Sequence, residues 1–254
     1  MSQQFPHDRQ QSMARLIAER GSLTIEDLVR HFESSAPTIR RDLTLLERAG
    51  LASRTHGGVI SPGIRVGKAD APFLDKLRRH HGAKRRIGRA AAAHVENRQT
   101  IFIDSGTTAL ALAQRLAGRS VTIVTVDLKV AEAASVGNTQ VHIVGGLIRN
   151  GIYSIAGDAA LKAVSELKFD TFFMTADALD LAGVSNSSRE AVAIAQLGMK
   201  RARRTILISD HSKLGQRSLV KLCPLSALDL LITDRVAAPV IEPYRQTIQR
   251  VEMC

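Results

Sequence analysis

Residues 100–116 combine a strand, a glycine turn and a helix, an order that is typical of anion-binding sites. An aliphatic run at 100–103 leads to an aspartate, a Ser-Gly-Thr-Thr turn follows, and an Ala/Leu-rich helical run fills 109–116. Backbone N–H groups at a helix N-terminus and neighbouring hydroxyls favour negative charge, as phosphate binding requires. The turn by itself is also compatible with a simply capped helix. The residues of this candidate site are Asp104, Ser105, Gly106, Thr107 and Thr108.

The outward face of a short helix near the N-terminus is a second candidate site. Ser35 is expected to cap this helix, Pro37 lies in its first turn, where a missing N–H costs nothing, and Gly50 ends it. A slender basic helix fits the major groove of DNA, where arginine pairs with guanine edges. A surface helix with solvated arginines has the same periodicity. The candidate DNA-binding residues are Ser35, Pro37, Thr38, Arg40, Arg41, Thr44 and Arg48 in the helix, with Arg54 and His56 beyond it.

This helix belongs to a small domain that we place at residues 1–60. Apolar residues at helical spacing predict one helix around residues 13–17 and a second after a cap at Thr24. Residues 51–59 favour two short strands around a Gly-Gly pair, because glycine supplies the positive φ of a tight hairpin. The sequence therefore predicts a domain of three helices and a β-wing.

The positive charge of the chain is unevenly distributed. The 254 residues include 35 Lys and Arg against 24 Asp and Glu, and the net charge of +11 favours polyanionic partners. The excess is concentrated in residues 71–100, which hold eight basic and two acidic side chains. Pro62 and Gly63 mark a boundary before this block, and we expect a basic linker at residues 61–82. A charge run is also typical of a solvated surface, so this one supports nucleic-acid binding without proving it.

Composition excludes several classes of protein. The chain is 44% apolar and 23% charged, as folded globular proteins are. Its aliphatic runs fall short of the roughly 20 apolar residues that span a bilayer, and its N-terminus lacks the apolar stretch of a secretory signal. Two cysteines are too few for a disulfide framework or a cysteine-rich zinc site, and the eight histidines show no metal-ligand spacing. We therefore expect a cytoplasmic protein with no membrane contact, no metal and no cofactor.

Residues 83–254 alternate β-type runs with helical stretches, which predicts an α/β domain with a mostly parallel sheet. Ligands of such sheets bind at the carboxyl ends of the strands. The β-type runs lie at 100–104, 121–125, 141–144, 171–174 and 205–208. Besides the turn after the first strand, the candidate effector-binding residues at these ends are Asp127, Gly145, Gly146, Asp210 and Lys213.

Motifs along nearly the whole chain resemble the DeoR family of bacterial sugar-catabolism regulators. The runs SAPTIRRDL at 35–43 and RTHGG at 54–58 resemble the family's winged helix-turn-helix. The runs FIDSGTT at 102–108 and SDHSK at 209–213 resemble its sensor domain. The resemblance implies an N-terminal winged helix-turn-helix plus a C-terminal α/β sensor domain, similar in fold to ribose-5-phosphate isomerase, glucosamine-6-phosphate deaminase and CoA transferases.

The same resemblance implies roles for individual residues. Residues 105–108 would hold a phosphate group and Lys213 would add a cation, while Asp104, Asp127 and Asp210 would contact hydroxyl groups of the effector. Two positions depart from the family pattern. Ser34 replaces an aliphatic residue, which we expect to loosen the turn before the DNA-reading helix. Val126 replaces an asparagine, which we expect to remove one polar contact to the effector.

The favoured function is a repressor of sugar or polyol catabolism genes that a phosphorylated sugar or related metabolite releases from double-stranded operator DNA. Two-fold symmetric operators imply a homodimer or homotetramer. One alternative is a sugar-phosphate isomerase or deaminase with a DNA-binding appendage. Another is a constitutive DNA-binding module with a vestigial sensor. If the glycine-threonine turn were sealed beneath aliphatic side chains, no effector could reach it and the proposed regulation would be impossible.

Overall fold

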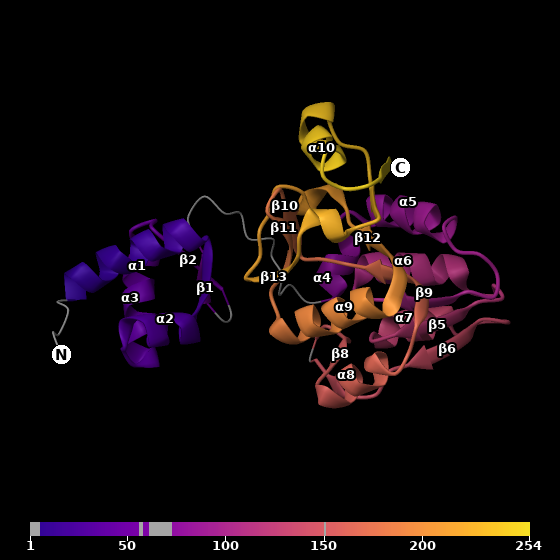
Figure 1. Cartoon of the computed structure of the whole chain (residues 1–254), viewed down its shortest axis with the longest axis horizontal. Coiled ribbons are helices and arrows are strands. Elements are labelled where there is room, and N and C mark those ends of the chain that lie inside the picture. Colours follow the sequence, from indigo (N-terminus) through magenta and orange to yellow (C-terminus); the bar gives the residue numbers. More distant parts are fainter. Residues whose placement is uncertain (1–5, 56–57, 61–72, 150) are drawn as a thin grey trace.

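The chain folds into a small N-terminal domain and a larger α/β domain, which the computed structural model describes over residues 6–55, 58–60, 73–149 and 151–254 (Figure 1). The N-terminal domain confirms the three predicted helices and the wing, and it adds one strand that pairs with the wing. Its elements are α1 (Pro6–Arg20), β1 (Ser22–Thr24), α2 (Ile25–Phe32), α3 (Ala36–Arg48), β2 (Ser53–Thr55) and β3 (Gly58–Ile60).

Side-chain caps begin α2 and α3 at the positions that the sequence predicts. Thr24 and Asp27 form a capping box at α2, because Asp27 N donates to Thr24 Oγ1 at 3.0 Å and Thr24 N donates to Asp27 Oδ2 at 3.1 Å. At α3, the backbone N–H of Thr38 donates to Ser35 Oγ at 3.4 Å. Each cap satisfies an N–H group that has no partner within the helix.

A buried ion pair joins α3 to α1. Asp42 is 3% exposed, and its carboxylate accepts a hydrogen bond of 2.7 Å from Arg9 Nε. The turn before α3 is also held, because the hydroxyl of Ser34 donates to the carbonyl of Phe32 at 3.1 Å. The polar residue therefore adds a hydrogen bond within the turn, which argues against the expected loosening at Ser34.

A seven-stranded parallel sheet forms the centre of the α/β domain, in the order β15-β14-β12-β9-β4-β5-β6. All five predicted strands are confirmed, and the sheet contains two more near the C-terminus. The strands are β4 (Thr100–Ile103), β5 (Thr122–Thr125), β6 (Gln140–Ile143), β9 (Phe169–Met174), β12 (Ala202–Ile208), β14 (Leu230–Thr233) and β15 (Val251–Met253).

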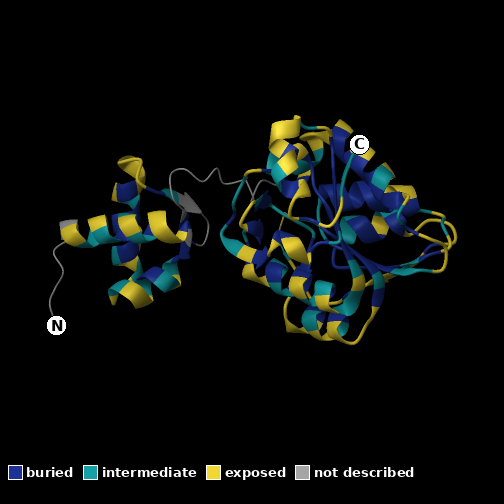
Figure 2. Cartoon of the chain, turned by 45° about the horizontal axis from the view of Figure 1, so that its top comes forward, coloured by how far each residue is buried: buried dark blue, intermediate teal, exposed yellow. Residues whose placement is uncertain are grey.

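Helices cover both faces of this sheet, so its central strands are buried on two sides (Figure 2). Ile101 and Ile103 pack in one apolar layer, and Phe102 between them packs in the other, as the period of two requires. The first layer contains α5 (His81–Ala92), α6 (Thr107–Leu116) and α7 (Leu128–Ala134). The second contains α8 (Asp158–Ser165), α9 (Arg189–Arg201) and α10 (Ala238–Arg245).

Short elements surround the carboxyl ends of the central strands. An antiparallel sheet comprises β10 (Ala178–Asp180), β11 (Gly183–Asn186) and β13 (Val220–Cys223), and a second pair comprises β7 (Leu147–Ile148) and β8 (Ile155–Ala156). Two 3-10 turns, η1 (His211–Lys213) and η2 (Leu225–Ala227), follow β12 and β13. No described helix is long and apolar enough to cross a bilayer.

The range 61–82 contains packed structure as well as a connection. Residues 61–72 lie outside the described part of the chain, but Phe73–Arg78 forms helix α4, and α5 begins at His81. Phe73 is 5% exposed, and its ring packs edge-on against Tyr153 with centroids 5.3 Å apart. The charge pattern of this range does not indicate a docked helix, because Phe73 is a single apolar anchor among charged neighbours.

Gly88 sets the close approach of α5 to α6, the helix that carries the glycine-threonine turn. A Cβ at Gly88 would lie 2.5 Å from the carbonyl oxygen of Ala111. Gly88→Ala should therefore lower the free energy of unfolding by about 1–3 kcal/mol through overpacking, as measured by urea denaturation. Gly82→Ala in the same helix is the control, since its Cβ would lie 3.8 Å from the nearest atom, in Arg86. Equal stability of the two variants would contradict this packing argument.

Candidate functional site

The strand order of the parallel sheet reverses between β4 and β9. After β4 the chain adds β5 and β6 on one side, and it then crosses to β9, β12 and β14 on the other. Sheets of this kind bind ligands in the crevice outside the carboxyl ends of the strands at such a point. The segments that begin there are residues 104–108 after β4 and residues 175–177 after β9. The topology therefore brings the glycine-threonine turn to the expected ligand position.

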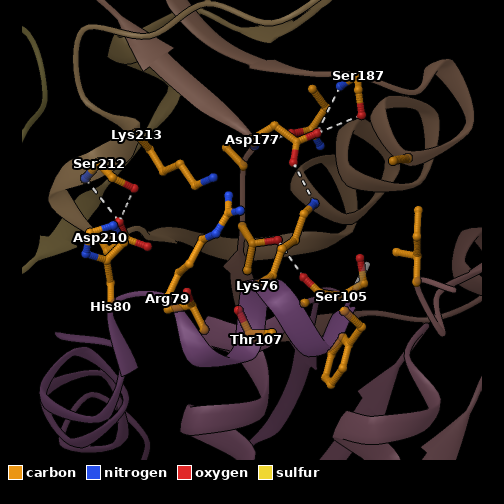
Figure 3. A pocket seen from close by; sticks show the side chains of 18 of the residues that line it. Lys76, Arg79, His80, Ser105, Thr107, Asp177, Ser187, Asp210, Ser212 and Lys213 are labelled. Atoms are coloured by element: carbon orange, nitrogen blue, oxygen red, sulfur yellow. Dashed lines mark hydrogen bonds and ion pairs between the residues drawn. The ribbon is translucent and has the colours of Figure 1, made fainter. Parts of the chain in front are cut away.

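A cavity of about 750 Å³ lies at this edge of the sheet, and we call it the effector cavity (Figure 3). Its volume falls in the range of roughly 300–1,000 Å³ that small-molecule sites occupy. Of the predicted effector residues, Ser105, Gly106, Thr107, Thr108, Asp210 and Lys213 line it. Other polar lining residues, which the sequence analysis did not single out, include Lys76, Arg79, His80, Lys84, Arg149, Thr175, Asp177, Ser187 and Ser212.

The N-terminus of α6 opens into the effector cavity without a side-chain cap. Gly106 occupies the cap position with φ +111°, a conformation that L side chains rarely adopt, and no side chain caps the helix there. The first-turn N–H groups of Thr107 and Thr108 have no carbonyl partner within the helix. Both residues line the cavity and are less than 9% exposed. Uncapped amides, two hydroxyls and the helix dipole together favour an anion at this position.

Asp104 joins the ends of β4 and β9. Its carboxylate accepts hydrogen bonds from Ser105 N at 2.8 Å and from Thr175 N at 3.1 Å. It is 6% exposed, and burial raises its pKa to about 6, although the backbone hydrogen bonds oppose the shift. The carboxylate therefore holds the backbone of the cavity, and it is not among the groups that line it, so the predicted contact of Asp104 with effector hydroxyls lacks structural support.

Asp127 has a similar structural role beneath the turn. It is fully buried and caps α7 by accepting from Lys129 N at 2.7 Å and Val130 N at 3.1 Å. Its other oxygen accepts from Gly106 N at 2.9 Å, which fixes the cap glycine of α6. Burial raises the pKa of Asp127. Asp127 is not among the residues that line the cavity, and its two oxygens hold α7 and the turn, so its contact with effector hydroxyls stays a prediction.

Three other predicted positions lie away from the cavity lining. A Cβ at Gly146 would lie 2.7 Å from the carbonyl oxygen of Ala156, so this glycine permits the close approach of β8. Gly145 is exposed and does not line the cavity. Val126 is 2% exposed within the apolar layer of Phe102. Its side chain contributes to the core, so replacing an asparagine there changes packing and not the cavity wall.

Asp210 and its neighbours form the wall opposite the turn. Asp210 is 2% exposed, and its Oδ1 accepts from Ser212 N at 3.0 Å. Its ligand atoms and those of His80 and His211 lie within 4.8 Å of one another, a grouping that could hold a metal ion and that sequence spacing does not indicate. Asp234 accepts from His211 Nδ1 at 2.7 Å. The cations that surround this group favour an anion over a metal at this wall.

Most of the positively charged side chains that line the effector cavity come from residues 73–84. The sequence did not predict that this segment belongs to the site. Lys76 forms an ion pair of 3.4 Å with Asp177. The ammonium group of Lys84, which is 6% exposed, donates to the backbone carbonyls of Lys76 and Arg79. Burial lowers the pKa of Lys84 to about 8, while Asp210 opposes the shift. The basic block that the sequence assigns to a linker therefore forms one wall of the effector cavity.

The predicted DNA-reading face of α3 is exposed. Ile39, Leu43 and Leu46 are buried in the domain core, and the side chains on the opposite face are exposed or half-buried. The hydroxyl of Thr44 donates to the carbonyl of Arg40 at 2.9 Å, so it is held along the helix. The exposed or half-buried members of the set are Ser35, Pro37, Thr38, Arg40, Arg41, Thr44 and Arg48. Arg54 belongs to β2, and His56 lies outside the described residues, so its DNA contact stays a prediction.

Together, the fold and the site define a two-domain regulator, in which a helix-turn-helix domain is joined to a ligand-binding α/β domain. Residues 9–64 match the family described as "DeoR-like helix-turn-helix domain", and residues 79–235 match "DeoR C terminal sensor domain". The chain belongs to the DeoR family of transcriptional regulators, as the sequence motifs predict.

Two curated relatives and one solved structure illustrate these similarities. The chain is 30% identical over 233 residues to the HTH-type transcriptional regulator GolR of Listeria innocua, and the alignment covers 91% of each chain. It is 32% identical over 229 residues to the glycerol-3-phosphate regulon repressor of Escherichia coli, covering 89% of this chain and 90% of that one. A ribose 5-phosphate isomerase A structure from Methanocaldococcus jannaschii aligns with a TM-score of 0.39 and 13% identity, over 52% of this chain and 54% of that one.

The raised pKa of Asp104 makes a prediction about stability. The pKa of Asp104 in the folded chain lies above the value of 3.8 that applies to an unfolded chain. The contribution of Asp104 to the free energy of unfolding is therefore fully present below pH 3.8 and is lost as the pH rises through about 6. The loss should be about 3 kcal/mol over this window. Urea denaturation from pH 4 to 7 should show this decline in the wild type and a flatter profile in Asp104→Asn. Parallel profiles would place the titration on another group.

Proposed function

We propose that the chain is a repressor of sugar or polyol catabolism genes, which a phosphorylated sugar or related metabolite releases from double-stranded operator DNA. The observation that carries this proposal is the uncapped N-terminus of α6 at the wall of a large polar cavity, in a chain whose other domain exposes a basic helix. An effector that weakens operator binding must itself bind less tightly to the DNA complex, because coupling between sites is reciprocal.

In this proposal, residues 105–108 hold the phosphate group through backbone amides and the hydroxyls of Thr107 and Thr108. On the wall opposite the turn Lys213 adds a cation, and Asp210 contacts a hydroxyl of the effector with the carboxylate oxygen that Ser212 leaves free. One relative is named the glycerol-3-phosphate regulon repressor, after a small phosphorylated polyol, and this name supports a phosphorylated effector for the present chain.

We infer that the effector cavity binds without catalysing. An isomerase or deaminase needs an acid and a base within reach of the substrate. Asp104 and Asp127, the two buried carboxylates nearest the turn, hold backbone amides and are not free for these roles. The relatives named as transcriptional regulators support binding over catalysis by the groups that do line the cavity. A constitutive DNA-binding module is also disfavoured, because Ser105 to Thr108 line an open cavity and are not sealed beneath aliphatic side chains.

A homodimer or homotetramer would present two α3 helices to a two-fold symmetric operator. Half-sites read by such a pair lie one helical turn of DNA apart, about 34 Å, or at multiples of that distance. Operator binding also requires access to the chromosome, which agrees with the cytoplasmic location that the sequence predicts.

Replacement of Arg41 tests the DNA-reading role of α3. Arg41 is exposed on the outward face of the helix, where a bidentate contact with guanine contributes about 1–3 kcal/mol. Arg41→Ala should therefore weaken operator binding by that amount and relax base preference, as measured by fluorescence anisotropy with operator and random duplexes. Arg245→Ala, at an exposed position in the last turn of α10, is the charge-matched control. An equal loss on all duplexes would make Arg41 a phosphate contact.

Phosphorylated sugars and Thr107 test the effector-binding role. A sugar phosphate at about 100 times its Kd should stabilise the chain by roughly 2.7 kcal/mol in a thermal-shift panel and release operator DNA. Thr107→Phe should remove both responses, because the ring would fill the N-terminus of α6, and should leave operator affinity within about twofold. Thr247→Phe, on an exposed turn, is the control. If no phosphorylated sugar shifts the wild type or releases DNA, the proposed effector class is wrong.

A further inference from the structure

The cations of the effector cavity outnumber its carboxylates. Five lysine and arginine side chains line it against the two carboxylates of Asp177 and Asp210. Lys76 is paired with Asp177 at 3.4 Å, and the ammonium of Lys84 is held by two backbone carbonyls. The cations that line the cavity are Lys76, Arg79, Lys84, Arg149 and Lys213.

Arg79 and Lys213 converge on one part of this cavity although they come from distant segments. Figure 3 shows the guanidinium group of Arg79, just beyond α4, and the ammonium group of Lys213, in η1, extending toward the same space. Among the described residues, neither side chain forms an ion pair with a carboxylate. Both lower the pKa of Lys84, so three positive groups act on one another here. Like charges brought together in this way repel, and an anion between them removes the cost.

This convergence lies across the cavity from Ser105, which directly precedes the cap glycine of α6. In Figure 3 Lys213 lies toward one side of the cavity and Ser105 toward the other, with Lys76 between them. A single phosphate group bound at the turn would therefore leave the space between Arg79 and Lys213 without an anion. The volume of about 750 Å³ leaves room for a longer ligand.

From this we infer that the effector carries two anionic groups, one held at the N-terminus of α6 and a second held between Arg79 and Lys213. The inference rests on the proposed function and narrows its ligand class to a phosphorylated sugar with a second phosphate or a carboxylate. Arg79 then supplies a planar pair of N–H donors and Lys213 a point charge, a combination that suits either oxyanion.

Matched pairs of probes test this inference by isothermal titration calorimetry on the full chain. Fructose 6-phosphate is compared with fructose 1,6-bisphosphate, and glucose 6-phosphate with 6-phosphogluconate. In at least one pair the probe with two anionic groups should bind about tenfold or more tightly than the probe with one. A preference in the first pair identifies a second phosphate, and a preference in the second pair identifies a carboxylate.

A double variant assigns the preference to the two cations. Arg79→Gln with Lys213→Gln should reduce the ratio within the pair to about threefold or less, because the probe with two anionic groups loses far more affinity than the probe with one. Arg85→Gln with Lys221→Gln removes the same charge from exposed positions outside the cavity and should keep the ratio.

The outcomes separate this inference from the proposed function. Equal affinities within both pairs, or a preference that survives in the Arg79/Lys213 variant, would overturn the second anionic group alone, provided that a monophosphate still releases operator DNA. Failure of all four probes to bind and to release operator DNA would count against the inference and the proposed function together.

Discussion

The carboxylate of Asp104 links the segments that follow β4 and β9, the two strands between which the strand order reverses, and the shape of the effector cavity depends on this contact. It accepts N–H groups from Ser105 beyond β4 and from Thr175 beyond β9. Burial of a carboxylate is costly, and backbone hydrogen bonds offset part of the cost. Asp127 supports the same turn from below through Gly106. With the turn fixed from two directions, the N-terminus of α6 faces the cavity before any ligand arrives.

Local patterns were sufficient to predict most of the fold. The β-type runs identified five strands of the parallel sheet, β4, β5, β6, β9 and β12, because strands buried on both faces are continuous apolar segments. The caps at Thr24 and Ser35 and the glycine at 106 were equally readable, since each depends on neighbours within a few residues. Family motifs then identified the two domains, and the matches at residues 9–64 and 79–235 agree with them.

The composition of the cavity wall could not be predicted in the same way. A carboxylate at the end of a strand can face a ligand or a backbone amide, and only the tertiary structure assigned Asp104 and Asp127 to the second role. The basic residues near α4 resembled a linker because charge patterning carries no information about docking. Phe73, a single aromatic residue, brings Lys76 and Arg79 to the cavity. These contacts join segments about a hundred residues apart, as between Lys76 and Asp177.

The location of the basic block also determines how operator binding responds to ionic strength. Proteins that neutralise DNA phosphates release condensed counterions, and the slope of affinity against salt counts those contacts. Residues 71–100 hold the largest excess of positive charge, but part of it faces the effector cavity, whereas residues 1–70 carry ten basic and eight acidic side chains. The salt dependence of operator binding should therefore reflect only the few arginines around α3. It should be far weaker than expected if all the basic residues behind the sequence pI of 10.3 contacted DNA.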